Sequence, residues 1–354
     1  MNRNSQTPAQ LGYRMPAEWE PHAATWLSWP RRDGISFPGS YDQVLPALAK
    51  MVAALAESEQ VNINTRGAAH EEEIRRALAR ENVAKLPNVR FHHIPTNEPW
   101  CRDHGPIFLT NPAREQKLVA IDWEYNAWGW KYPPFDLDNA VPRKVAAALG
   151  EIPVFSPGMV LEGGSIEVNG AGTLLTTESC LLNPNRNPTL KQAEIERRLR
   201  DFLGVSKILW LGDGIEGDDT DGHIDDLTRF VSRTSVVTVV EEDEHDENYE
   251  PLQLNLARLR EMSAEDGTPL TVRTLPMPGR IVREGQRLPA SYANFYIANS
   301  VVLMPAFNDP HDAWAAAVLR EAFPTRRIVS IDCRELIWGL GAFHCLTQQQ
   351  PAAD

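Results

Sequence analysis

The hydrophobic residues of the chain follow two alternating patterns, one typical of helices and one typical of short buried strands. Residues 42–57 and 312–323 carry apolar residues at helical spacing, and Asp42 and Asp312 stand where an N-cap is expected. Short runs rich in β-branched residues lie between such segments and predict buried strands. These runs read VNINT, VRFHHI, KILWL, SVVTVV, SVVLM and RIVSI. The pattern therefore predicts a mixed α/β fold.

The predicted elements recur in one order: strand, strand, helix, strand. One unit has a hairpin in residues 161–177, a helix at about 189–203 and the strand KILWL. Three further units follow this scheme, with helices at about 140–149, 251–263 and 312–323. A fifth unit is divided between the termini, so that FHCLTQ near the end is expected to pair with ATWLSWP near the start.

Units of this kind bury their faces against neighbouring units, and a divided terminal unit closes such an array into a ring. We therefore expect a ring of five modules, with the helices outside and the first strand of each hairpin toward the axis. The alternative is an open α/β sandwich. Because no composition break divides the 354 residues, we expect one domain over residues 1–354, with a flexible N-terminal extension at about residues 1–12.

Charge and composition argue against several classes of function. The net charge of −13 disfavours nucleic-acid binding, which needs a basic face, and favours a small cationic substrate. No segment is long and apolar enough to span a bilayer, and no nucleotide-binding motif is present, so we expect no membrane partner and no organic cofactor. The four cysteines are scattered without CxxC spacing, which is typical of a reducing cytoplasm. A homo-oligomer stays open.

Side chains suited to catalysis stand at matching points of the predicted units. Asp103 comes just before the strand IFLT, and Glu162 comes just before SIEV. His223 and Asp225 stand at the entry of LTRFV, and Cys345 lies in the first strand of the divided unit. If the ring is closed, these strand starts converge on one cavity, which we take as the candidate active site.

Alternation along extended strands assigns the candidate residues to faces. His223 and Asp225 share a face if their segment is extended, and Asp226 then points away. By the same alternation His344 points opposite to its neighbour Cys345 and is a poor base for it. His223 is the better candidate to exchange protons with the thiol, and Glu162 is the candidate to hold its other ring nitrogen.

A thiol among several carboxylates suits one class of substrate. Acidic neighbours raise the pKa of a thiol, which disfavours the thiolate for a neutral acyl substrate. A guanidinium reverses this effect, because carboxylates bind it in a planar, bidentate manner and its charge stabilises the thiolate. The carboxylates therefore favour an enzyme that modifies guanidines over a papain-like protease.

Each candidate also has a structural interpretation. Cys345 is alternatively a buried core thiol, and Asp103 is alternatively the partner of Arg102 in an ion pair. Cys101 is the rival nucleophile, whereas Cys180 and Cys333 are expected in the core. A zinc site would draw on Cys101, His104, His223 and Asp225. That set has no close ligand pair, so we expect no metal.

Six segments, in order along nearly the whole chain, resemble the agmatine deiminase family of guanidino-group modifying enzymes. They are MPAEWEPHAATWLSWP, WCRDHGP, MVLEGGSIEVNGAGTLLTTESCLLNPNRNP, GDDTDGHIDD, ASYANFYIAN and FHCLTQQQP. The resemblance implies a five-bladed, pseudo-symmetric α/β propeller. It also implies hydrolysis of agmatine to N-carbamoylputrescine and ammonia through a covalent cysteine amidino-thioether, without a cofactor.

The resemblance also implies the roles of individual residues. They are the nucleophile Cys345, the general acid/base His223, the guanidinium-binding Asp103 and Asp225, the histidine-orienting Glu162 and the pocket-lining Trp100. The chain departs from the family at Leu340–Gly341–Ala342, where well-characterised members carry Gly-Gly-Asn. The departure bears on how the far end of the substrate is held.

Other guanidine chemistries stay open from the sequence. The alternatives are deimination of free arginine or peptidyl-arginine, an amidinotransferase on the same scaffold, and non-catalytic binding of a cationic metabolite. Free arginine would need a cation for its α-carboxylate, for which Arg102, Arg186 and Arg229 are candidates.

Overall fold

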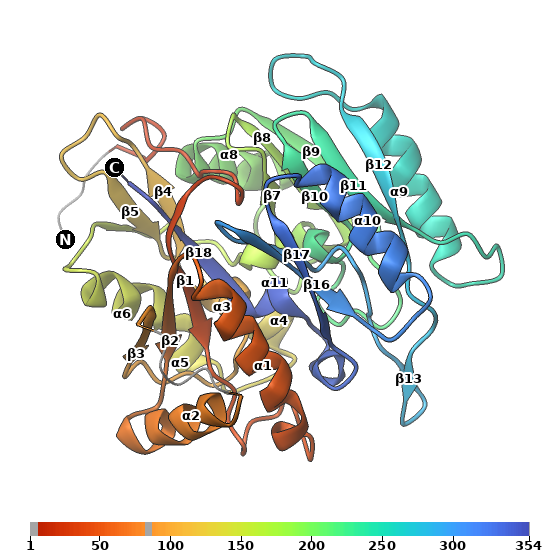
Figure 1. Cartoon of the computed structure of the whole chain (residues 1–354). Helices are drawn as coiled ribbons and strands as arrows, with labels where there is room; N and C mark the ends of the chain where they lie inside the picture. The colour runs from red at the N-terminus through yellow and green to blue at the C-terminus, as the bar shows by residue number, and fades with distance from the viewer. Residues whose placement is uncertain (1–5, 82–86, 354) are drawn as a thin grey trace.

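The computed structural model of the protein describes residues 6–81 and 87–353 and has mixed α/β architecture (Figure 1). Within the described residues, no helix is both long and apolar enough to cross a membrane. Residues 1–5 of the expected N-terminal extension lie outside the description. Of the rest, the Ala9 N–H donates to the Asp201 carbonyl at 3.0 Å, and the Leu11 carbonyl accepts from Asn111 Nδ2 at 3.1 Å.

Four three-stranded sheets share one topology: the first two strands run antiparallel, and the third runs parallel to the second. Their strands are β4 (Ile107–Thr110), β5 (Leu118–Ile121) and β6 (Val154–Phe155); β7 (Glu167–Val168), β8 (Thr173–Thr177) and β9 (Lys207–Leu211); β10 (Thr228–Ser232), β11 (Ser235–Val240) and β12 (Thr271–Pro276); and β15 (Tyr296–Ile297), β16 (Val301–Ala306) and β17 (Arg327–Asp332). These are the four internal units that the sequence pattern predicts.

A fifth sheet joins the two ends of the chain. Its order is β18 (Thr347–Pro351), β1 (His22–Ser28), β2 (Gln60–Asn64) and β3 (Val89–His92). β18 pairs antiparallel with β1, and β2 runs parallel to both of its neighbours. The expected pairing of the terminal segments is therefore confirmed. A separate small hairpin consists of β13 (Val282–Arg283) and β14 (Gln286–Arg287).

In each unit, a helix of eight residues or more connects the second strand to the third, as predicted. Short one-turn helices, α4 (Ala127–Trp130), α5 (Asp136–Asn139) and α7 (Glu178–Leu181), lie in the same connections of two units. The longer helices are α1 (Tyr41–Leu55), α6 (Val141–Ala148), α8 (Gln192–Leu203), α9 (Tyr249–Glu261) and α10 (Asp312–Ala322), and α2 (Ala68–Arg80) connects β2 to β3 in the terminal sheet. Their apolar faces pack inward; in α1 the stripe Val44, Leu48, Met51, Val52 and Leu55 is almost fully buried. Figure 1 shows α2 and α9 at the periphery, outside the strands.

The predicted N-caps are wrong in detail. α1 follows Ser40, and α10 follows His311. Asp42 lies inside the first turn of α1 and pairs with Arg32 at 2.7 Å. Asp312 accepts the Phe307 N–H at 3.0 Å and so fixes the loop that leads into its helix. Each carboxylate interacts with a group outside the helix end. The spacing of residues along the chain does not predict these interactions.

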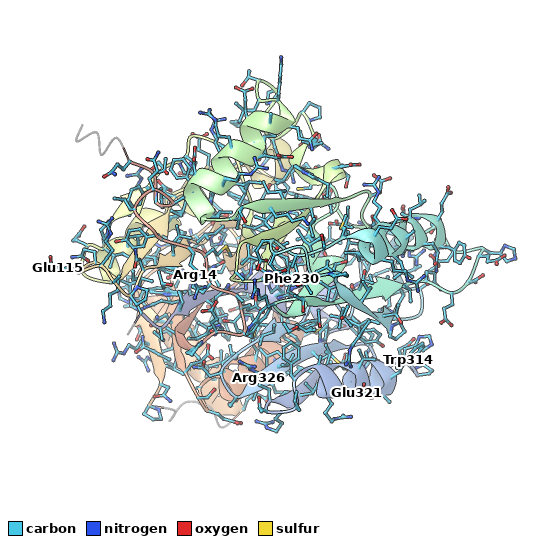
Figure 2. The ribbon with its side chains drawn as sticks, turned by 90° about the horizontal axis from the view of Figure 1, so that it is seen from above. Arg14, Glu115, Phe230, Trp314, Glu321 and Arg326 are labelled. Atoms are coloured by element: carbon cyan, nitrogen blue, oxygen red, sulfur yellow. The ribbon has the colours of Figure 1, made fainter. Side chains whose placement is uncertain are left out.

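The centre of the molecule is apolar and densely filled. Figure 2 places Phe230, which is fully buried, near the middle of the molecule, whereas Glu115, Trp314 and Glu321 lie at its rim. One large hydrophobic cluster covers the sheets of β2, β11 and β16, and a second joins β4 and β5 to β7, β8 and α8.

A buried charge network lies inside this apolar core. Glu18 is 4% exposed, and its carboxylate binds Arg229 at 2.9 Å, Arg102 at 3.1 Å and His344 at 2.8 Å. It also accepts the Ile297 N–H at 2.8 Å. Burial alone would raise the pKa of Glu18, but Arg229, His344 and Arg102 outweigh it and hold the pKa well below its ordinary value.

We expect Glu18→Gln to lower the free energy of unfolding by about 3–5 kcal/mol, because it leaves Arg102 and His344 without their buried counter-charge. Glu20→Gln is the matched control. Its pair with Arg14 is part-exposed, so the loss should stay below about 1 kcal/mol. Because the folded pKa of Glu18 is depressed, its contribution is present above the unfolded pKa of about 4.3 and disappears as pH falls through the folded value.

Denaturant unfolding of both variants and the parent at pH 7 and at acid pH measures these differences. Equal losses for the two substitutions at pH 7 would contradict the central role of Glu18.

Candidate active site

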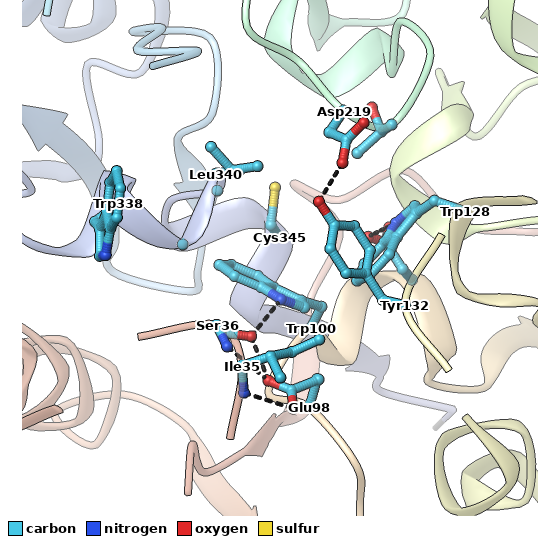
Figure 3. Close-up of a pocket in the computed structure, with 14 residues that line it drawn as sticks. Ile35, Ser36, Glu98, Trp100, Trp128, Tyr132, Asp219, Trp338, Leu340 and Cys345 are labelled. Carbon is cyan, nitrogen blue, oxygen red and sulfur yellow. Dashed lines mark hydrogen bonds between the residues drawn. The ribbon is translucent and has the colours of Figure 1, made fainter. Parts of the chain in front are cut away.

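A cavity opens beside Cys345 (Figure 3). Its empty volume is about 590 Å³, part of which is open to solvent. The walls are mostly aromatic and aliphatic, and every acidic or basic side chain that lines it is a carboxylate. The lining side chains include Ile35, Glu98, Trp100, Asp103, Trp128, Tyr132, Asp219, Trp338, Leu340 and Cys345. This matches the size and character of a site for one small molecule.

Cys345 lies in α11 (Phe343–Leu346), a single helical turn just before β18, and not in the strand where we expected it. The thiol is 5% exposed, and Figure 3 shows it directed into the space between Leu340 and Tyr132. Burial raises the pKa of Cys345 well above its ordinary value, and the nearby carboxylates raise it further. The thiol is therefore placed in the cavity but disfavoured as a thiolate while the cavity holds no cation.

His223 and Asp225 also lie on a tight turn where an extended strand was expected. His223 immediately precedes the 3₁₀ turn η2 (Ile224–Asp226), so the argument from strand alternation was wrong. The two side chains nevertheless meet: His223 Nδ1 lies 4.0 Å from Asp225 Oδ1. Asp226 does not point away. Its carboxylate lies within 4.8 Å of both Asp225 and the Cys345 sulfur.

Asp103 comes from α3 (Cys101–His104), on another unit. Its Oδ1 accepts the Gly164 N–H at 3.1 Å and lies 3.7 Å from His223 Nδ1, and its Oδ2 accepts the Trp128 indole N–H at 3.0 Å. Burial and the neighbouring Asp225 raise the pKa of Asp103 to about 6, although His223 opposes the shift. The alternative ion pair with Arg102 is wrong, because Arg102 binds Glu18 instead.

Gly164 permits this close arrangement. It lies in the turn η1 (Gly163–Ser165). A Cβ at this position would come within 2.6 Å of His223 Nδ1 and 2.8 Å of Asp103 Oδ1. Any larger residue would therefore push the histidine and the aspartate apart.

His223 is fully buried, and neither of its ring nitrogens has a hydrogen-bond partner among the described residues. Burial would lower the pKa of His223, but Asp103, Cys180 and Asp225 outweigh it and raise the pKa well above its ordinary value. Cys180, expected only in the core, thus lies beside the histidine. A buried imidazole with a free nitrogen facing carboxylates is available for proton transfer.

Glu162 lies near His223 without a hydrogen bond to it. The polar atoms of Glu162, Cys180 and His223 lie within 4.8 Å of one another. Glu162 Oε1 accepts from Arg186 Nε at 2.7 Å, and Oε2 is buried without a partner in the described structure. The cation Arg186, remote in sequence from both, takes the contact that we expected for the histidine.

His344 lies behind Cys345 and lines no part of the cavity. Its Nδ1 contacts Asp225 Oδ2 at 2.6 Å, and its Nε2 contacts Glu18 Oε2 at 2.8 Å. Burial would raise the pKa of Asp225, but His344, His223 and Arg229 hold it below its ordinary value. His344 therefore keeps Asp225 ionised, while the other carboxylate oxygen, Oδ1, is buried and has no hydrogen-bond partner in the part of the chain that the structure describes.

The loop before α11 forms one wall of the cavity. Gly341 allows Trp100 to approach, since a Cβ there would lie 2.6 Å from the indole ring. Leu340 lines the cavity from a left-handed backbone with φ +68°, a conformation that favours glycine. Ala342 is buried and does not line it. Of the two positions that differ from Gly-Gly-Asn, Leu340 is therefore the one whose side chain lines the cavity.

Sequence reasoning missed several residues of the site. Trp128, Tyr132 and Asp219 line the cavity, and Asn294 contacts the Cys345 sulfur at 3.0 Å. Trp128 and Tyr132 stand in the aromatic stretch of residues 127–132, and Asn294 stands in the segment ASYANFYIAN, so composition and motif offered a signal for them. Asp219 stands in the segment GDDTDGHIDD, which offered the same kind of signal, and the loop 213–222 brings it to the cavity.

The proposed zinc ligands do not come together. Among the described residues, the sets of three or more potential ligand atoms are Glu162 with Cys180 and His223, and Asp225 with Asp226 and Cys345. Neither set contains Cys101 or His104. Cys101 is fully buried and does not line the cavity, whereas Cys345 does, so the geometry favours Cys345 over its rival.

Comparison with known proteins identifies the family. The model of the Porphyromonas-type peptidyl-arginine deiminases matches residues 14–351. An agmatine deiminase of Pseudomonas aeruginosa is 39% identical to the chain, with 99% of each protein covered. The solved agmatine deiminase of Enterococcus faecalis has a TM-score of 0.91 at 33% identity and covers 99% of this chain and 98% of its own.

A third similar structure is an agmatine deiminase variant of C. jejuni with substrate bound. It has a TM-score of 0.86 at 32% identity and covers 96% of this chain and 97% of its own. The resemblance drawn from the sequence motifs is thus confirmed, and the chain belongs to the Porphyromonas-type peptidyl-arginine deiminase family.

Proposed function

We propose that this protein hydrolyses agmatine to N-carbamoylputrescine and ammonia. The observation that carries the proposal is the meeting of the Cys345 thiol and Asp103, which line one cavity, with the buried Asp225 and His223 beside them. Asp103 comes from α3, and His223 and Asp225 come from the turn at η2. The relatives named agmatine deiminases support the choice of substrate. Agmatine hydrolysis would place the protein in polyamine synthesis.

The reaction follows from this geometry. The guanidinium lies between Asp103 and Asp225 and stabilises the Cys345 thiolate, which attacks the guanidinium carbon. The C–N bond breaks while His223 protonates the leaving ammonia, and an amidino-thioether remains. His223 then takes a proton from water, which attacks the same carbon. As the C–S bond breaks, the hydroxyl group of this adduct releases its proton to solvent, the ureido product leaves, and the thiolate returns.

Glu162 acts on His223 through space in this scheme. Its unpartnered Oε2 lies close to the buried imidazole, and its charge favours the protonated form that delivers a proton to ammonia. Trp100 and Trp128 supply flat apolar walls that keep bulk water away from the reacting carbon. No step requires a metal or an organic cofactor.

The charges around the cavity favour agmatine over free arginine. Arg102, Arg186 and Arg229, the candidates for an α-carboxylate, are all buried in ion pairs away from the cavity. Asp219, which lines the cavity, accepts a hydrogen bond from Tyr132 and pairs with Lys131 at 3.2 Å. Within the described structure no cationic side chain lines the cavity, so a terminal carboxylate would have no counter-charge on its walls.

We further infer that the five sheets surround one axis as a five-bladed, pseudo-symmetric α/β propeller in a single catalytic domain. Contacts between neighbouring units support this. β18 contacts β4, β7 contacts β10, and α9, α10 and α1 contact β9, β12 and β17 of the preceding unit. One hydrophobic cluster joins the β4–β6 sheet to the β7–β9 sheet, which accounts for the fifth neighbouring pair.

All four cysteines are free thiols, which supports a cytoplasmic location for the protein.

Replacing Cys345 with Ala should abolish turnover, because no other thiol lines the cavity of the described structure. Release of ammonia and ureido product from agmatine and from arginine, measured side by side, tests this. Cys333→Ala removes a thiol that is equally buried but lies away from the cavity, and should keep its activity. Turnover by Cys345→Ala, or a preference for arginine, would refute the proposal.

The reactivity of Cys345 should depend on the charge of the reagent. Burial and the carboxylates raise the pKa of the thiol, so a neutral haloacetamide should react slowly at pH 7.5 and faster as pH rises. A cationic haloacetamidine can lie between Asp103 and Asp225 and should react at least roughly tenfold faster at pH 7.5. Mass spectrometry of the labelled peptide measures both rates. Equal rates would argue against the guanidinium cradle.

Protonation of Asp103 should lower kcat/KM at acid pH. The carboxyl group has a pKa of about 6 in the free protein, and its protonated form cannot pair with a guanidinium. We therefore expect kcat/KM for agmatine to fall as pH drops below about 6, because this parameter reports the free enzyme. Initial rates between pH 4.5 and 8 measure it. A profile that stays flat down to pH 5 would show that Asp103 does not control binding.

A further inference from the structure

Asn294 occupies the position in its unit that the known site residues occupy in theirs. Asp103, Glu162, Asp225 and Cys345 each stand within five residues of the first strand of a different sheet, at β4, β7, β10 and β18. Asn294 stands two residues before β15, the first strand of the remaining sheet. The fifth unit therefore also directs a polar side chain toward the common centre.

The side chain of Asn294 is 1% exposed and makes four contacts there. Its Nδ2 lies 3.0 Å from the Cys345 sulfur and 2.9 Å from Asp226 Oδ1. Its Oδ1 accepts the His344 N–H at 3.1 Å and the Cys345 N–H at 3.4 Å. One amide thus holds the sulfur, the backbone turn that carries it and the carboxylate next to it.

The groups around the Cys345 sulfur explain why this donor matters. Asp225 and Asp226 face it from η2, Asp103 faces it from α3, and all three carboxylates disfavour the thiolate. His344, on the same turn as the thiol, has both ring nitrogens on Asp225 and Glu18.

The remaining cationic candidate is His223. The described structure shows no hydrogen bond between its ring and the sulfur. Among the described residues, the amide of Asn294 is the side chain that donates to the sulfur. A hydrogen bond to the ionised sulfur is stronger than one to the neutral thiol, so this donor favours the thiolate.

The neighbouring carboxyl group is affected by the same amide. Burial, Asp225 and Asp218 raise the pKa of Asp226 well above its ordinary value, although the hydrogen bond from Asn294 opposes the shift. The Asn294 amide fixes the orientation of Asp226 by donating to its Oδ1.

We propose that Asn294 is a further catalytic residue of the deimination inferred above, one that orients the Cys345 sulfur toward the guanidinium carbon and stabilises its thiolate. This inference rests on the proposed function for the reaction that it serves. Its effect on the thiol exists with or without a substrate.

The experiment compares Asn294→Ala and Asn294→Asp with the parent. We expect kcat for agmatine to fall roughly 10- to 100-fold in Asn294→Ala, with a smaller change in KM, because the lost hydrogen bond acts on the nucleophile. Asn294→Asp keeps the shape but places an acceptor against the sulfur, and should lose more. Asn255→Ala is the control, since Asn255 is equally buried and bonds the Gly212 N–H and the Asp213 carbonyl away from the cavity.

A second readout needs no substrate. The rate of Cys345 alkylation by iodoacetamide is followed from pH 7 to 10.5 by mass spectrometry of its peptide. The rise in rate should move to higher pH in Asn294→Ala and further in Asn294→Asp, but not in Asn255→Ala. Melting temperatures and circular dichroism check that all variants fold.

The two readouts separate the inference from the proposed function. If the parent protein does not turn over agmatine but the alkylation profiles shift as expected, the proposed function fails and the effect of Asn294 on the thiolate stands. If Asn294→Ala folds and matches the parent in kcat or in its alkylation profile, the inference is overturned. A loss confined to melting temperature also overturns it, because that is the result of a structural role.

Discussion

The Glu18 carboxylate is the interaction on which the rest of the structure depends. It is a buried charge that binds Arg102, Arg229, His344 and the Ile297 N–H, groups from segments at opposite ends of the sequence. Isolated, each of these charges would be costly in an apolar core. Together they neutralise one another, and the turns that carry Asp103 and Cys345 are tied to the same point. Catalytic geometry and core stability are thus two results of one network.

The site beside this network contains buried polar groups that lack hydrogen-bond partners in the described structure. His344 keeps Asp225 ionised through its contact with Oδ2. Within residues 6–81 and 87–353, Asp225 Oδ1, Glu162 Oε2 and both ring nitrogens of His223 are buried without hydrogen-bond partners. A protein normally satisfies such groups. In the proposed reaction, a guanidinium supplies the N–H donors that the carboxylate oxygens lack. Its positive charge also offsets the carboxylates that disfavour the Cys345 thiolate.

Several features of the fold could be predicted because they repeat. The helices α1, α8, α9 and α10 lie within a few residues of their expected positions, since the helical spacing of apolar residues is a local property. The pairing of β18 with β1 followed from the order of elements. What failed was local geometry at the site. Asp225 and Cys345 lie on one-turn helical segments instead of strands, and His223 immediately precedes one of them. Hydrogen bonds to distant units shape these turns, as where the His344 and Cys345 N–H groups donate to Asn294.

The sequence by itself determined which residues meet and what chemistry they suit: a thiol, an imidazole and carboxylates at the starts of successive units imply a cationic substrate. Only the tertiary structure decided how each one is held. Arg186 binds Glu162 and leaves His223 unpartnered, His344 bridges Asp225 and Glu18, and Asn294 contacts the sulfur. The physical reason is that a hydrogen bond in the core is settled by distance in space among competing partners. Those distances are set when all the sheets pack together, and no local stretch of the chain contains them.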